Sequence, residues 1–236
     1  MAMPLVQPST QDGDFLLLVE GPNDRHAISQ LVWLVYGAEP AFGILDCGSD
    51  DRVLKNLSLR LADANPHQRV LGLILDTDIE GSGEEDAVQR RWAQLKSKIE
   101  AGYSLPDEFP EAGLIIDPLP GRKSKGTLPR IGVWLMPNNR AFGMFEDLLM
   151  ESLGDHEKEY TSNVVTKAKA DRVASFHDSH LSKAVIRTFM AWQEPPDLQY
   201  LGLAIKKGHF QKIDVACAHF LDWLGRLYDP LTRQTP

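Results

Sequence analysis

The chain has 236 residues, of which 43% are hydrophobic and 25% are charged, and its formal net charge is −8. This composition is that of an ordinary globular protein with room for one substantial core, and it argues against nucleic-acid binding by a simple excess of positive charge. No stretch approaches the roughly 18 apolar residues of a membrane span, and residues 1–14 lack the basic and apolar regions of a signal peptide, so we expect a cytoplasmic protein with no membrane partner.

The charges are unevenly distributed along the chain. Residues 1–120 contain 9 Lys and Arg against 20 Asp and Glu, whereas residues 121–236 contain 16 against 13. Any contact with a polyanion would therefore depend on bound cations and on the second half of the chain. A chance distribution of surface residues explains the same asymmetry equally well.

Apolar runs and helical patterns alternate in the first half. Residues 15–19 and 70–75 are continuously apolar, which predicts two buried parallel strands, and residues 42–45 predict another. A helix is expected after each strand, because apolar residues recur there at helical spacing. These helices cover residues 23–35, residues 49–61, and a third segment that begins at the capping box of Ser82 and Glu85 and ends near Ile99. The order predicts an α/β fold with a mostly parallel sheet flanked by helices.

The second half begins with two short strands and then turns helical. The strands are expected at residues 113–116 and 131–136, and the apolar spacing predicts helices over residues 144–153, 183–193 and 213–227. The five tryptophans stand mostly on apolar faces and are expected in the core. We predict an α/β domain over residues 1–153, with a helical C-terminal extension over residues 154–236 packed on it.

Three acids follow two of these apolar runs. Glu20 comes directly after residues 15–19, and Asp76 and Asp78 follow residues 70–75. In open α/β sheets the ligand site lies beyond the carboxyl ends of the strands, so these carboxylates are expected to converge. Because neighbouring carboxylates repel one another as anions, a divalent cation is the ordinary partner, and hard oxygen ligands favour Mg²⁺, Mn²⁺ or Ca²⁺.

Two motifs carry a family resemblance. Residues 19–21 (Val-Glu-Gly) after the first strand and residues 76–78 (Asp-Thr-Asp) after the third resemble the Toprim domain, over roughly residues 14–153. That domain serves topoisomerases, bacterial primases and the overcoming-lysogenization-defect nucleases. Residues 132–139, followed by residues 143–147, are similar to a small group of uncharacterised bacterial Toprim-related proteins of about this length. The resemblance implies a Toprim-like, Rossmann-like fold.

The resemblance also implies roles for further residues. Glu20 would be a metal ligand or a general base, and an acid at the offset of Asp24 joins the metal site of the nucleases. Glu146 and Asp147 would help to complete a second metal site, and Lys183 would stabilise charge at phosphorus. Each residue has an ordinary explanation as well, since acids at strand ends are often solvated, acids in the first helical turn favour the helix dipole, and lysines on helices are commonly solvated.

The leading hypothesis is a Mg²⁺- or Mn²⁺-dependent nuclease in which Glu20, Asp76 and Asp78 hold one metal and water attacks phosphorus. Its nucleic-acid substrate, DNA or RNA, is left open, as is homo-oligomer formation. The resemblance suggests phage defence or nucleic-acid processing, alone or with a separate ATPase protein. The alternative is a non-catalytic Toprim-like module that binds nucleic acid or nucleotides, which Asn138 favours because the related group tends to have Asp there. A small-molecule phosphotransferase with the same carboxylates is a third possibility.

Overall fold

A five-stranded sheet forms the centre of the computed structural model, which describes residues 13–37, 39–63, 67–78, 86–120, 128–196 and 200–228. The strand order is β2-β1-β3-β5-β4, and β4 alone runs antiparallel to its neighbour. The strands are β1 (Phe15–Val19), β2 (Gly43–Asp46), β3 (Val70–Leu75), β4 (Leu114–Ile116) and β5 (Arg130–Leu135). The predicted α/β class with a mostly parallel sheet is confirmed.

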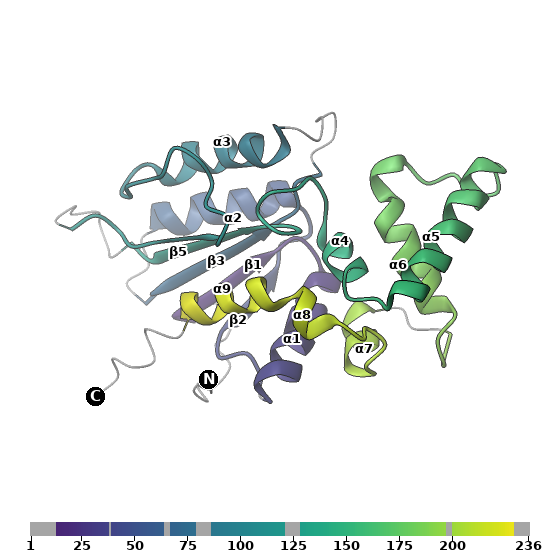
Figure 1. The fold of residues 1–236 in the computed structure, drawn as a ribbon. Coiled ribbons are helices and arrows are strands. Elements are labelled where there is room, and N and C mark those ends of the chain that lie inside the picture. The colour runs from purple at the N-terminus through teal and green to yellow at the C-terminus, as the bar shows by residue number, and fades with distance from the viewer. Residues whose placement is uncertain are drawn as a thin grey trace.

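Helices cover both faces of the sheet, as Figure 1 shows. The helices α2 and α3 lie on one face and α1 and α9 on the other, while α5 and α6 form a pair beyond one edge, next to α4. The predicted helical C-terminal part is therefore present, whereas the boundary at residue 153 stays a prediction. The bounds are α1 (Pro22–Tyr36), α2 (Asp50–Asp63), α3 (Ala87–Ile99), α4 (Phe145–Met150), α5 (Asp155–Ala170), η2 (Asp178–His180), α6 (Leu181–Ala191), α7 (Leu201–Lys206), α8 (Ile213–Ala216) and α9 (Ala218–Tyr228).

The continuous apolar runs of β1 and β3 follow from burial of both sheet faces. Alternate strand residues point to opposite faces, so Leu17 and Val19 join the core beneath α1 and α9, while Leu16 and Leu18 join the core beneath α2 and α3. All four side chains are fully buried. A polar residue at any of these positions would be buried against one helical layer or the other, which is why the runs contain none.

The last helix fastens the C-terminal part to the sheet. The indole Nε1 of Trp223 donates to the carbonyl oxygen of Leu114 at 3.1 Å. The hydroxyl of Tyr228 donates to the carbonyl oxygen of Leu16 at 3.0 Å. The ring of Tyr228 also stacks on that of Phe42, with centroids 4.0 Å apart. The core on this face therefore joins residues from both ends of the chain.

Several helical segments differ from the sequence expectation. The helices α5 and α7 were not predicted, and the segment expected as one helix over residues 213–227 forms α8 and α9. Trp33 and Trp192 are 44% and 49% exposed, so these two tryptophans are not core residues. The expected capping box of Ser82 and Glu85 lies outside the described residues. Within the described part of the chain, no helix has the length and apolarity needed to cross a membrane.

Candidate active site

The acid that follows β1 forms a hydrogen bond with the backbone of the acid that follows β3. These strands are parallel neighbours, so their carboxyl ends lie side by side. The backbone N–H of Asp76 donates to Oε1 of Glu20 at 2.8 Å. Asp78 follows two residues later, and the side chains of Glu20, Asp76 and Asp78 are all only partly buried. The carboxylates expected to converge from two strands therefore lie at one sheet edge that is open to solvent.

The N-terminus of α4 brings Glu146 and Asp147 to the same edge. The backbone N–H of Phe145 donates to Oδ1 of Asp76 at 3.2 Å, which places the start of α4 against the end of β3. Glu146 is 6% exposed, and its charge adds to the rise in the pKa of Asp76 that burial chiefly causes. Asp147 has a different environment, because its Oδ2 accepts the backbone N–H of Met144 at 2.7 Å and caps α4.

Asp24 enters from the first turn of α1. Its Oδ2 accepts the backbone N–H of Gly21 at 2.9 Å, so it caps the helix. The pKa of Asp24 is raised to about 6, chiefly by burial; the charge of Glu146 contributes to the rise, and the Gly21 hydrogen bond and the charge of Lys183 oppose it. The carboxylate of Asp24 therefore caps α1 and also lies close to the charged groups of Glu146 and Lys183.

Lys183, near the start of α6, faces these acids. Burial raises the pKa of Asp78, and the charges of Lys183, Arg91 and His180 act against that rise. Lys183 thus lies close enough to influence both Asp24 and Asp78, although its own side chain is exposed. The structure brings this predicted residue to the predicted acids from a helix more than 100 residues further along the chain.

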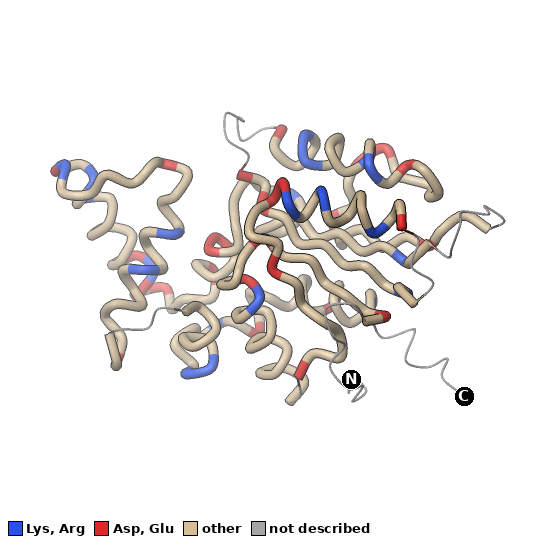
Figure 2. The backbone as a smooth tube through the Cα atoms, turned by 180° about the vertical axis from the view of Figure 1, so that it is seen from behind, with Lys and Arg blue, Asp and Glu red and all other residues tan. Residues whose placement is uncertain are grey.

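The carboxylates destabilise one another's charged forms. The pKa of Glu20 is raised to about 7, chiefly by burial; the Asp76 hydrogen bond and the charge of Arg91 oppose the rise, and the charge of Asp24 contributes to it. Burial also holds the pKa of Asp76 well above its usual range, reinforced by the charges of its acidic neighbours. Figure 2 shows acidic segments at the sheet edge beside the α5 and α6 pair. We name Glu20, Asp24, Asp76, Asp78 and Glu146 the acid cluster.

Thr77 holds the loop between β5 and α4 against this edge. Its buried hydroxyl lies 3.0–3.1 Å from the carbonyl oxygens of Met136, Ala141 and Gly143, and it accepts the backbone N–H of Gly143 at 2.8 Å. A loop fixed in this way keeps α4 in position to donate to Asp76. The threonine between the two aspartates is therefore the structural member of the Asp-Thr-Asp motif.

Residues 14–229 match the family model described as "Protein of unknown function (DUF3226)". The chain belongs to this family. No curated protein and no solved structure matches it.

Asn138 has a local role in this DUF3226 protein. Its Oδ1 accepts the backbone N–H groups of Arg140 at 3.1 Å and Ala141 at 2.9 Å, so it closes a turn after β5. Asn139 is buried with a φ of 65°, and its Oδ1 accepts the backbone N–H of Leu135 at 2.7 Å. Both side-chain oxygens are thus engaged in shaping the loop that Thr77 anchors.

Arg91 is the residue at this site that the sequence did not single out. Its side chain is 2% exposed, its Nε donates to the carbonyl oxygen of Asp76 at 2.9 Å, and its guanidinium forms an ion pair with Asp50 at 3.1 Å. Burial raises the pKa of Glu20 and of Asp78, and the charge of Arg91 opposes both rises. Nothing in the sequence distinguishes it from Arg90 except that it lies on the same helical face as Leu95, four residues later.

The acid cluster offers the hard oxygen ligands that Mg²⁺ and Mn²⁺ prefer. Among the described residues, however, no three His, Cys, Asp or Glu side chains are grouped as metal ligands. In this structure, Glu20, Asp24 and Asp76 each direct one carboxylate oxygen to a backbone N–H.

Proposed function

We propose that this protein is a Mg²⁺- or Mn²⁺-dependent phosphodiesterase that cleaves nucleic acid. The observation that carries the proposal is the acid cluster, in which burial and mutual repulsion raise the pKa of carboxylates at the carboxyl ends of parallel strands. Perturbed titratable groups that converge where an α/β sheet binds its ligands are typical of catalytic sites. The resemblance of the Glu20 and Asp-Thr-Asp motifs to the Toprim nucleases supports the same activity.

The residues divide into three roles under this proposal. Glu20, Asp76 and Asp78 would hold one cation, and Asp24 and Glu146 would help to hold a second. A divalent cation in such a site supplies Lewis acidity toward phosphoryl oxygens. As an alternative to ligating the cation, Glu20 would accept a proton from attacking water, a role that suits its raised pKa of about 7 in the metal-free protein.

Lys183 and Asp147 have separate parts in the proposal. Lys183 would donate to a non-bridging oxygen of the phosphodiester as negative charge develops there. Asp147 would chiefly hold the start of α4, since it caps that helix and its carboxylate also bonds to the side chain of Ser182. We place the activity in the cytoplasm, in phage defence or nucleic-acid processing, with or without a separate ATPase.

A non-catalytic module that binds nucleic acid or nucleotides is the second candidate. It is favoured by the backbone hydrogen bonds that Glu20, Asp24 and Asp76 already make, which give these acids a structural use without a cation. The two candidates differ in whether phosphodiester bonds are broken, and a cleavage assay separates them.

The test is cleavage of end-labelled single- and double-stranded DNA and RNA, with Mn²⁺ or Mg²⁺ and with a chelator. The wild type is expected to cleave at least one substrate only when the metal is present. Asp76→Asn should abolish cleavage, while the control Asp214→Asn, an exposed residue of α8, should cleave like wild type. Metal-independent cleavage, or equal cleavage by Asp76→Asn, would contradict the proposal, and tight binding without cleavage would favour the second candidate.

Lys183→Ala distinguishes transition-state stabilisation from simple binding. Because a donor to the developing charge helps the transition state more than the bound substrate, single-turnover cleavage should fall by roughly 10²-fold or more. Equilibrium binding measured in Ca²⁺ should change much less, since one phosphate contact is a modest share of the affinity. The control is Lys207→Ala, an exposed lysine after α7. An unchanged rate in Lys183→Ala would remove this lysine from the mechanism.

A further inference from the structure

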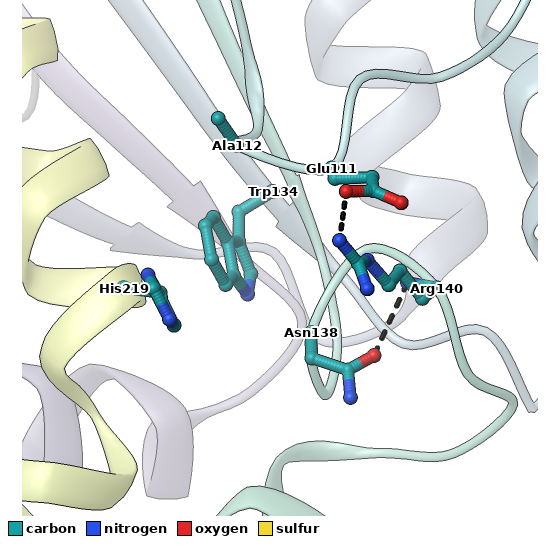
Figure 3. A pocket seen from close by; sticks show the side chains of 6 residues that line it. All are labelled: Glu111, Ala112, Trp134, Asn138, Arg140 and His219. Atoms are coloured by element: carbon teal, nitrogen blue, oxygen red, sulfur yellow. Dashed lines mark hydrogen bonds and ion pairs between the residues drawn. The ribbon is translucent and has the colours of Figure 1, made fainter.

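A cavity that is lined by no member of the acid cluster opens beside the end of β5. Its volume is about 380 Å³, and its floor is the side chain of Trp134. Its rim comes from the turn before β4, the loop after β5 and the start of α9, as Figure 3 shows. The described lining residues are Glu111, Ala112, Trp134, Asn138, Arg140 and His219.

The indole N–H of Trp134 lacks a hydrogen-bond partner within the described structure. The side chain is 2% exposed, and Nε1 itself is buried. The two other buried tryptophans differ, because Trp92 and Trp223 donate to carbonyl oxygens at 3.3 and 3.1 Å. Figure 3 shows the indole nitrogen on the ring edge that faces the space between His219 and Asn138. A buried donor without a partner is unfavourable unless something at the cavity accepts its hydrogen bond.

The rim adds further donors around the same space. The guanidinium of Arg140 forms an ion pair with Glu111, and this pairing neutralises the one acid among the described lining residues. Arg140 is 63% exposed and carries more N–H groups than that pair uses. The imidazole of His219 stands on the opposite side, and the oxygen of Asn138 is directed to backbone N–H groups. The cavity therefore presents the donors of Trp134 and Arg140 beside a single carboxylate, that of Glu111, whose charge the ion pair balances.

We propose that this cavity, the Trp134 pocket, binds a small anionic ligand through a carboxylate or phosphate oxygen. The ligand's oxygen accepts hydrogen bonds from the indole of Trp134 and the guanidinium of Arg140, with His219 as a further donor. The volume is within the range of small-ligand pockets in proteins. The proposal is independent of the phosphodiesterase, because it uses none of the acid-cluster residues.

The experiment follows the indole N–H signals of the ¹⁵N-labelled full-length chain by NMR during separate titrations with phosphate, acetate and uridine. The Trp134 signal is assigned with Trp134→Phe and, independently, by sequential assignment of the wild type. It should shift and saturate with at least one of the two anions and stay in place with uridine, which is neutral. A shift with phosphate alone or acetate alone identifies which anionic group the pocket takes.

Two surface variants complete the test, since both positions are exposed and their replacement leaves the fold intact. Arg140→Gln should weaken the anion's affinity at the Trp134 signal by about tenfold, the loss typical of a charge-assisted hydrogen bond. The matched control Arg172→Gln, on the turn after α5, should bind like wild type. No shift with either anion, a shift with uridine alone, or equal affinities of Arg140→Gln and Arg172→Gln would overturn the proposal.

Discussion

At the scale of single residues, the acid cluster combines hydrogen bonds that stabilise the fold with charges that oppose it. The backbone N–H groups of Gly21, Asp76 and Phe145 are each satisfied by a carboxylate oxygen. Burial and the neighbouring acids nevertheless disfavour the ionised forms, so the pKa of Glu20 rises to about 7 and that of Asp24 to about 6. The hydrogen bonds and the charges can be separated experimentally, because an amide side chain keeps the acceptor oxygen and removes the charge.

Glu20→Gln should change how stability depends on pH. The pKa of Glu20 is about 7 when folded and ordinarily 4.5, so between these values the unfolded chain binds fewer protons than the native state. The free energy of unfolding therefore falls as the pH rises from 4.5 to 7. Above pH 7, ionisation of Glu20 lowers it no further. In the absence of divalent cations, the Glu20→Gln variant should not show this loss of stability. Its free energy of unfolding at pH 8 should exceed that of wild type by about 1–2 kcal/mol, a figure reduced to allow for the partial exposure of the side chain.

Urea denaturation at pH 4.5, 6 and 8 in chelator measures this difference. The control is Glu159→Gln at an exposed position of α5, which should have the stability of wild type to within about 0.5 kcal/mol. If Glu20→Gln unfolds the protein or is less stable at every pH, the carboxylate of Glu20 is required by the fold itself.

Thr77→Val should destabilise the loop that carries α4. Valine keeps the shape of threonine but leaves the buried N–H of Gly143 without the hydroxyl that accepts it, which should cost about 1–3 kcal/mol of unfolding free energy. Thr77→Ser retains the hydroxyl and should cost less. Chemical denaturation compares the three proteins, and equal stability of Thr77→Val and wild type would show that the hydroxyl does not hold the loop.

At the scale of elements, the site is assembled from helices that contact one another closely. The short helix α7 packs on α1, which carries Asp24, and the contact occurs at a glycine. A Cβ atom at Gly202 would lie 2.6 Å from the backbone carbonyl oxygen of His26. Because backbone atoms cannot move aside as a side-chain end can, the close approach of these helices depends on this glycine.

Gly202→Ala should therefore destabilise the protein by about 1–3 kcal/mol through overpacking. The control is Gly225→Ala in α9, where a Cβ atom would come no closer than 3.4 Å, to the hydroxyl of Tyr36. Alanine is the better helix former, so this change should be neutral or stabilise by up to about 1 kcal/mol. Thermal and urea unfolding measure both variants, and a stable Gly202→Ala would contradict the packing of α7 on α1.

At the scale of the whole molecule, the sequence predicts the sheet better than the C-terminal helices. The strands β1 and β3 are buried on both faces, so their apolar runs identify them, and the position of Glu20 and Asp76 after those runs predicts that they meet. The helix α5 was missed because only Thr161 and Val165 of its side chains are buried, which leaves no apolar stripe in the sequence. Arg91 was missed because its burial depends on tertiary contacts with Asp50 and the Asp76 carbonyl.

The spacing of residues in the sequence does not indicate that α6 packs near the carboxyl ends of the strands. Lys183 was selected by resemblance to the nucleases, and its charge acts on Asp24 and Asp78 in the folded chain. Such an arrangement depends on how segments that are far apart in the sequence pack together. The local propensities of a single sequence do not predict that packing.

The central claim is that the acid cluster binds a divalent cation, and metal-dependent thermal stability tests it most directly. Cation binding at 100 times the dissociation constant should add about 2.7 kcal/mol, or roughly 5–10 °C in Tm for a chain of this size. Wild type and Asp214→Asn should both show this rise with Mn²⁺ or Mg²⁺. Asp76→Asn, which keeps an acceptor for the Phe145 N–H, should be at least as stable as wild type in chelator and should gain little from metal. An equal rise in Asp76→Asn and wild type, or no rise in wild type, would contradict the account.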